Sequence, residues 1–253
     1  IIHKDKYTVS LVLSKLQNSV KINGTSFVLL IDPDKKNNDK IEKLVEHANI
    51  NDVDAIFVGG SLMMDSLYHE RIARIKSISN IPLILFPGGI NQINRHFDAM
   101  LFMSLISGRN PHYLIGEQVL AAPIVKDLGI ETISTGYILI DGGSSTTVEF
   151  ISGTKPLPTS RIDLIMSHVL AAQFLGMKFL YLEAGSGAKK RVPNEVVEMV
   201  AKESQLDLIV GGGIKTPKDA NELAQSGASF VVVGSAIENS IELMNDFSSA
   251  IHG

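Results

Sequence analysis

Eight short apolar runs recur along the chain, and amphipathic helical patterns separate most of them. We predict strands at 27–31, 55–58, 83–86, 99–104, 132–139, 179–183, 208–211 and 230–234. Continuous apolar runs are typical of strands buried on both faces of a parallel sheet. We predict helices at 39–49, 65–77, 111–125, 160–175, 193–203, 217–226 and 236–249. This alternation predicts an α/β fold, a single (β/α)8 TIM barrel over residues 1–253, close to the ~250 residues typical of that fold.

Two connections depart from the regular pattern. The segment from Phe86 to Ala99 begins with Pro87, Gly88 and Gly89 and is too short for a full helix. We therefore predict that the third barrel helix is missing or reduced. The segment 140–158 is long and rich in Gly, Ser and Thr, so we expect a loop or lid on the catalytic face.

Composition and charge narrow the function. The formal net charge is −4 and there is no long run of Lys or Arg, so nucleic-acid binding is not expected. The chain has no cysteine, which excludes disulfides and thiol catalysis and favours a cytoplasmic location. No apolar stretch reaches the ~18 residues of a membrane span, and no signal pattern is visible.

Glycine turns follow the seventh and eighth predicted strands, at Gly211-Gly212-Gly213 and at Gly234-Ser235. In a (β/α)8 barrel these two loops form a phosphate site from backbone N–H groups and a helix N-terminus. Each turn alone could simply permit a tight connection. Two such turns in this order favour a phosphorylated small-molecule substrate.

Polar residues follow three other predicted strands. Asp32 and Asp34 are hard oxygen ligands that suit Mg²⁺, although aspartate is also common in capped turns. Ser61 could bind the same metal or cap a helix. Glu183 ends a buried apolar strand and needs a partner there, which could be a substrate hydroxyl or a Lys or Arg of the barrel. Glycines after it allow backbone N–H groups to approach an anion.

These motifs together resemble the geranylgeranylglyceryl phosphate synthase family, which includes the bacterial heptaprenylglyceryl phosphate synthases. The resemblance runs from about residue 27 to the C-terminus and rests on segments 32–35, 59–61, 181–187, 211–214 and 234–235. The tyrosine–leucine–glutamate stretch is the most specific of them. An insertion at 136–154 is similar to that of the second subgroup, and a missing third helix is also a feature of the family.

The resemblance implies a prenyltransferase that joins a polyprenyl diphosphate, geranylgeranyl in the first instance, to sn-glycerol 1-phosphate, and that uses Mg²⁺. It assigns catalysis to Glu183, Tyr181 and Asp32, and the metal to Asp32 and Ser61. It assigns glycerol phosphate binding to Tyr181, Leu182, Glu183, Ala184, Gly185, Ser186, Gly187, Gly212, Gly213, Gly234 and Ser235. It also implies a homo-oligomer, a dimer or hexamer, that contacts membranes transiently as a peripheral protein.

One position departs from the family pattern. Many members carry a basic residue where this chain has Leu30, so Lys35 or a basic loop residue is expected to compensate. Phe86, Pro87, Phe97 and Phe102 lie near the missing helix and are candidates for an apolar groove, or for core packing.

Two alternatives stay open. The chain could be another phosphate-binding barrel enzyme, such as a sugar-phosphate isomerase or epimerase or a flavin oxidoreductase. It could also be a non-catalytic barrel that binds lipid or phosphate.

Overall fold

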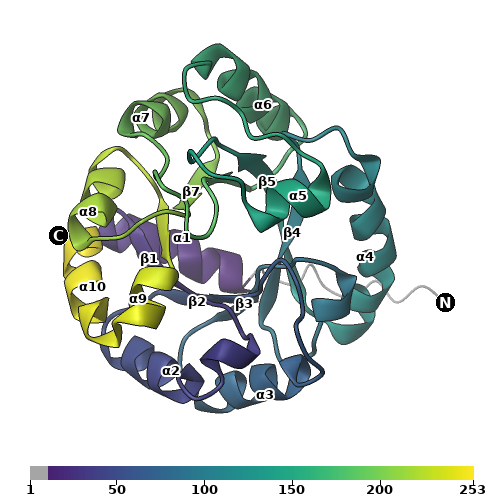
Figure 1. Cartoon of the computed structure of the whole chain (residues 1–253), viewed down its shortest axis with the longest axis vertical. Coiled ribbons are helices and arrows are strands. Elements are labelled where there is room, and N and C mark those ends of the chain that lie inside the picture. The colour runs from purple at the N-terminus through teal and green to yellow at the C-terminus, as the bar shows by residue number, and fades with distance from the viewer. Residues whose placement is uncertain (1–10) are drawn as a thin grey trace.

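The computed structural model describes residues 11–253, in which eight parallel strands close into a barrel (Figure 1). Each strand pairs with the next along the chain, and β8 pairs with β1. The strands are β1 Ser26–Ile31, β2 Ala55–Val58, β3 Leu83–Leu85, β4 Ala99–Leu105, β5 Glu131–Leu139, β6 Phe179–Glu183, β7 Asp207–Gly211 and β8 Phe230–Val233. All eight predicted strands are confirmed to within one residue at each end. Residues 1–10 of the predicted domain lie outside the described residues.

The outer helices surround these strands (Figure 1). They are α2 Ile41–Ile50, α3 Tyr68–Ile78, α4 Glu117–Leu128, α6 Ile162–Phe174, α7 Asn194–Glu203, α8 Pro217–Gln225 and α10 Met244–His252. Two of the predicted helices are more irregular than expected. A π-helical turn, η3 His112–Gly116, precedes α4, and the last predicted helix is divided into α9 Ser235–Asn239, η4 Ile241–Leu243 and α10. Short 3₁₀ turns occur at η1 Lys35–Asn37 and η2 Ile90–Gln92.

The third barrel helix is missing, as predicted from the short connection. Only the short turn η2 lies between β3 and β4. The long segment 140–158 is not a plain loop, because it contains the short helix α5 Thr147–Ser152. The side chain of Thr146 caps this helix by accepting a hydrogen bond of 3.2 Å from the backbone N–H of Glu149.

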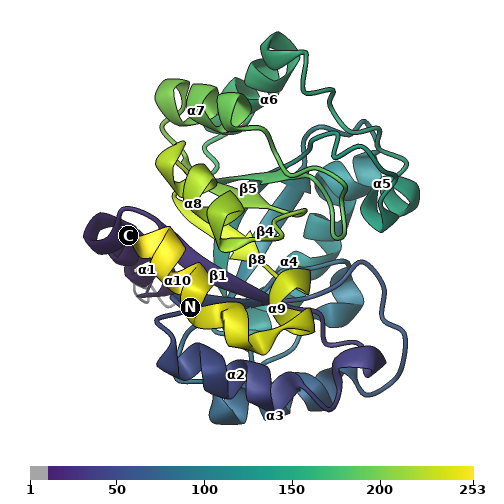
Figure 2. The ribbon, with the colours of Figure 1, turned by 60° about the vertical axis from the view of Figure 1, so that its left-hand side comes forward.

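Helix α1, Leu11–Asn23, was not predicted from the sequence and closes the N-terminal end of the barrel, opposite the end at which α5 lies (Figure 2). Its Val12 and Leu16 pack against the inward-facing side chains of the strands. The carboxylate of Glu131, at the start of β5, accepts hydrogen bonds from the N–H groups of Val12 and Leu13 at 2.9 and 2.8 Å. The open end of the barrel is therefore the C-terminal end of the strands. None of the helices within 11–253 has both the length and the apolar character needed to cross a bilayer.

Side chains alternate along each strand between two cores. Those of Leu180 and Leu182 face the helices, whereas those of Phe179, Tyr181 and Glu183 face the barrel interior. At the upper end of the interior, Tyr181 stacks on Phe86 with ring centroids 5.1 Å apart, and Tyr137 meets Tyr181 edge-on at 5.4 Å. These three rings pack against one another near the C-terminal ends of the strands, and we call them the aromatic base.

Candidate active site

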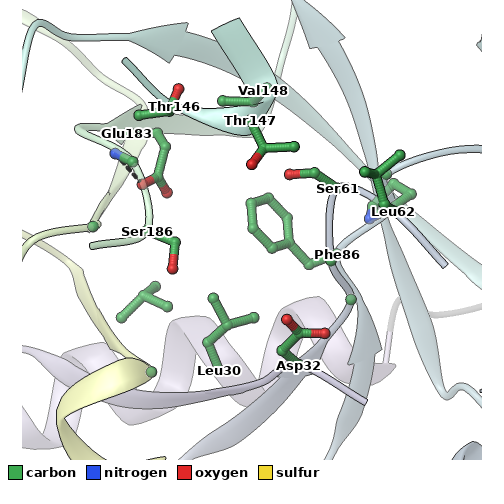
Figure 3. Close-up of a pocket in the computed structure, with 18 of the residues that line it drawn as sticks. Leu30, Asp32, Ser61, Leu62, Phe86, Thr146, Thr147, Val148, Glu183 and Ser186 are labelled. Atoms are coloured by element: carbon green, nitrogen blue, oxygen red, sulfur yellow. Dashed lines mark hydrogen bonds between the residues drawn. The ribbon is translucent and has the colours of Figure 1, made fainter. Parts of the chain in front are cut away.

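A cavity of about 870 Å³ opens at the C-terminal ends of the strands, above the aromatic base (Figure 3). The loops after β1, β2, β3, β6, β7 and β8 all contribute to its wall. The sequence-predicted residues that line it are Asp32, Ser61, Glu183, Gly185, Ser186, Gly187, Gly212, Gly213, Gly234 and Ser235. The structure therefore brings predicted residues from the ends of five strands, β1, β2, β6, β7 and β8, to one cavity.

Three predicted residues do not line the cavity. The side chains of Leu182 and Ala184 are buried against the helix layer, so only their backbones face the loop. Tyr181 is fully buried in the aromatic base beneath the cavity. Within the described residues, the Tyr181 hydroxyl makes no hydrogen bond of normal geometry. Gly211 leaves room for this hydroxyl, because a side chain at position 211 would overlap the phenol oxygen.

The glycine turns after β6, β7 and β8 meet on one side of the cavity. Gly212 has φ +77° and packs against the Glu183 carboxylate so closely that any side chain would overlap Oε1. Gly185, with φ +104°, packs in the same way against Thr146. The hydroxyls of Ser186 and Ser235 lie 3.4 Å apart and join the β6 loop to the β8 loop. This side therefore consists of closely packed backbone, as anion sites made from N–H groups do.

Glu183 lies at the centre of that side, with its carboxylate toward the cavity (Figure 3). Burial raises the pKa of Glu183 to about 7, although the hydrogen bond that its Oε1 accepts from the Gly185 N–H at 2.6 Å lowers it in part, as does the nearby Tyr181 phenol. Among residues 11–253, no Lys or Arg forms an ion pair with Glu183. The protein thus holds a carboxyl group whose pKa is raised toward neutral pH, which suits proton transfer or a hydrogen bond to a substrate hydroxyl.

Asp32 and Ser61 lie on the opposite side, on the loops after the neighbouring strands β1 and β2 (Figure 3). Burial raises the pKa of Asp32, and Lys36, whose Nζ is 3.4 Å from Oδ2, partly offsets this. Gly60 leaves space beside the carboxylate, because a Cβ there would lie 2.9 Å from Oδ1.

The oxygen atoms of Asp32 and Ser61 are suitable ligands for a metal ion that also binds the phosphate oxygens of a substrate. In the described part of the chain, no three His, Cys, Asp or Glu side chains gather into a metal cluster. Mg²⁺ is commonly bound through one or two carboxylates and the substrate's phosphates, so a single partly desolvated Asp32 with a hydroxyl nearby is compatible with it.

An apolar channel leads away from this polar chamber where the third helix is missing. Phe86 and Pro87 line the cavity as expected, and so does Phe102, but Phe97 is buried in the outer core and does not. Much of the apolar lining comes from elements not singled out from the sequence. These residues are Met100, Met103 and Leu105 from β4, Tyr113 and Ala121 from η3 and α4, and Val148 and Ile151 from α5. Their roles could not be read from a local motif, because they come from four separate elements.

Among residues 11–253, Lys36 and Lys215 line the cavity and Lys35 does not. Lys36 is 61 % exposed and faces Asp32, whereas Lys215 follows the glycine turn at Gly213. Leu30 lines the cavity beside Gly234 and leaves that position without charge. Two lysines on the loops therefore border the cavity, and compensation for the Leu30 position stays a prediction.

Comparison with known proteins agrees with this geometry. Residues 20–251 match the PcrB family. A geranylgeranylglyceryl phosphate synthase of Chitinophaga pinensis is 44% identical over 227 residues, which cover 90% of each chain. Among solved structures, wild-type GGGPS from Thermoplasma volcanium superposes with a TM-score of 0.88 at 33% identity, covering 95% of this chain and 97% of that one. The (S)-3-O-geranylgeranylglyceryl phosphate synthase from Thermoplasma acidophilum, in complex with substrate sn-glycerol-1-phosphate, gives 0.87 at 35% identity, with 98% and 99% covered.

Proposed function

The chain belongs to the PcrB family, and from this we propose that it transfers the prenyl group of a polyprenyl diphosphate to sn-glycerol 1-phosphate. It is a prenyltransferase of ether-lipid synthesis built on a (β/α)8 barrel. The products are a prenyl ether of glycerol phosphate and free diphosphate.

The observation that carries this proposal is the shape of the cavity. One continuous space joins a polar chamber, bordered by glycine turns and two carboxylates, to an apolar channel where the third helix is missing. A phosphorylated polar acceptor fits the chamber, and a long hydrocarbon donor fits the channel. A sugar-phosphate isomerase or a flavin oxidoreductase would have no use for such a channel.

The acceptor would bind on the side of β6, β7 and β8. Backbone N–H groups at Gly212, Gly213, Gly234 and Ser235 would hold its phosphate. Gly185, Ser186 and Gly187 would border the glycerol, and Glu183 would bind its hydroxyls. Tyr181 would act from below as part of the aromatic base, and Leu182 and Ala184 through their backbones.

The donor diphosphate would bind on the side of β1 and β2, where Asp32 and Ser61 would hold Mg²⁺. When bound, the metal supplies positive charge that stabilises the leaving diphosphate. Lys36 and Lys215 would add charge that the Leu30 position lacks. The prenyl chain would pass Phe86 and lie along Phe102 and the inner faces of α4 and α5.

In the transfer, the bond from the allylic carbon to the diphosphate oxygen breaks, and its electron pair leaves with the diphosphate. A glycerol hydroxyl oxygen attacks the same carbon and forms the ether bond. The hydroxyl proton passes to Glu183 or to solvent. Because carbocation character at the allylic carbon reduces the need for a strong base, Glu183 acts first by orienting the hydroxyl.

Peripheral membrane contact follows from the donor, because a polyprenyl diphosphate resides in a bilayer. Helices α4 and α5, which contribute to the cavity lining, also carry the exposed apolar side chains of Val119, Leu120 and Phe150. We propose that the protein works in the cytoplasm, takes its donor from the membrane surface, and forms a dimer or a hexamer.

Incubation with labelled sn-glycerol 1-phosphate and prenyl diphosphates of increasing length tests the proposal. We expect Mg²⁺-dependent formation of a prenyl ether and release of diphosphate. Activity on a sugar phosphate that survives removal of Mg²⁺ would instead identify another phosphate-binding barrel enzyme. Tight binding of both compounds without any product would identify a binding protein.

A further inference from the structure

The backbone of Asp32 is held by a half-buried carboxylate on the other side of the site, that of Glu238. Oε1 of Glu238, on α9, accepts a hydrogen bond from the Asp32 N–H at 3.1 Å and another from Nδ2 of Asn37 at 3.0 Å. The same Asn37 amide donates to the Asp32 carbonyl at 2.8 Å. One glutamate and one amide therefore bind both polar groups of the Asp32 backbone.

Asn37 and Glu238 are a buried and a half-buried residue that do not line the cavity. Asn37 is only 4 % exposed, and burial raises the pKa of Glu238. Neither residue is among those that line the cavity, although Asp32, Ala236 and Asn239 are. Glu238 can thus affect a substrate only through the residues it holds.

Glu238 also belongs to the acceptor side of the site. Its own N–H donates to the carbonyl of Gly234 at 3.0 Å, so it lies in the first turn after the proposed phosphate-binding residues Gly234 and Ser235. The hydrogen bond from Asp32 spans 206 positions of sequence and joins the loop after β1 to the loop after β8. The two proposed substrate sides are therefore connected by this carboxylate.

We propose that Glu238 is a positioning residue, which fixes the Asp32 backbone against α9 and so sets the donor diphosphate at a constant distance from the acceptor. The proposal rests on the function proposed above for Asp32. Residues that orient a metal ligand through hydrogen bonds typically contribute 10–100-fold to metal affinity or activity.

The first test compares Glu238→Ala with Glu238→Gln. Glutamine keeps an oxygen that can accept both hydrogen bonds, whereas alanine removes it. We expect alanine to lower kcat/KM for the donor by roughly tenfold or more and to raise the Mg²⁺ concentration for half-maximal turnover, and glutamine to remain within about threefold of wild type. Glu242→Ala, which removes an exposed glutamate nearby, serves as the matched control. Equal losses in the alanine and glutamine variants would overturn the proposal.

The second test asks whether Glu238 acts through Asp32. The double variant Asp32→Asn/Glu238→Ala should lose no more activity than Asp32→Asn alone, because coupled residues are not additive. Calorimetry with sn-glycerol 1-phosphate alone should give the same affinity for Glu238→Ala as for wild type. Additive losses, or weaker acceptor binding alone, would show that Glu238 acts elsewhere.

A third measurement does not depend on activity. Amide hydrogen exchange over residues 32–38 should be faster in Glu238→Ala than in wild type, and unchanged exchange would overturn the proposal. If Glu238→Ala fails to fold, Asn37→Ala breaks the same arrangement and should give the same pattern. A wild-type protein that makes no prenyl ether would refute the proposed function, whereas the exchange result would still decide whether Glu238 holds this loop.

Discussion

Glu183→Gln replaces a buried carboxyl group that can ionise with an amide that cannot. The folded protein has the Glu183 pKa raised from 4.5 to about 7, with burial as the main cause. Between these two pH values the folded state keeps a proton that the unfolded state has released. Stability therefore falls as pH rises through this window, because the unfolded state binds fewer protons. Glutamine does not titrate, and Glu183→Gln should lack this loss.

The size of the effect follows from the two pKa values. Each unit of pKa corresponds to about 1.4 kcal/mol, so a rise from 4.5 to about 7 corresponds to about 3 kcal/mol. Glutamine can keep the hydrogen bond from the Gly185 N–H, since its Oε1 is also an acceptor. For a chain of this length, the variant should melt on the order of 5–10 °C higher than wild type above pH 7, relative to their difference near pH 4.5.

Melting temperatures of wild type and Glu183→Gln at pH values from 4.5 to 8.5 measure this directly. A difference between the two proteins that stays constant with pH would refute the raised pKa. Single-turnover rates of Glu183→Gln and Glu183→Ala then separate its two chemical roles. A positioning role predicts that glutamine retains far more activity than alanine, whereas a general-base role predicts that both fall by ~100-fold or more.

Three further predictions concern the other parts of the site. Asp32→Asn should lower turnover by roughly 100-fold at limiting Mg²⁺, and chelation of Mg²⁺ should abolish product in wild type; near-normal rates in either case would exclude Asp32 as the metal ligand. Gly234→Val should lose acceptor binding in calorimetry with its fold retained, because the φ of Gly234 is −122° and the nearest atom to a Cβ there would be the Leu30 carbonyl oxygen at 3.3 Å. Gly213→Val is a poorer test, because the φ of Gly213 is +71°. Phe102→Ala should raise KM for a long donor by roughly tenfold and leave that of a short donor unchanged, and equal effects on both would place the chain elsewhere.

The strands were predictable because each carries its own signal. Burial on both faces requires a continuous apolar run, so Ala55–Val58 and Phe179–Glu183 were predicted at their observed ends. The capping box of Thr216 and Asp219 before α8 is also local, since both of its hydrogen bonds are made within four residues. The absence of the third helix was predictable because the segment between Phe86 and Ala99 is too short for a full helix.

Two helices, α1 and α5, were not predicted from the sequence. Helix α1 begins without an acidic first turn, and it is held by Glu131 of β5 and by the barrel interior rather than by its own pattern. Helix α5 has only six residues, fewer than an isolated helix needs for stability. Both depend on packing against distant elements.

Polar and glycine residues that directly follow apolar strands must meet at the same end of a parallel barrel, so the sequence was enough to predict which loops border the cavity. How those residues are packed around the cavity depends on contacts between distant parts of the chain. The tertiary structure placed Tyr181 beneath the cavity, Lys36 beside Asp32, and Glu238 at the backbone of Asp32 from 206 positions away. It also raised the pKa of Glu183, because desolvation depends on every atom packed around the carboxylate and not on the residues next to it in the chain.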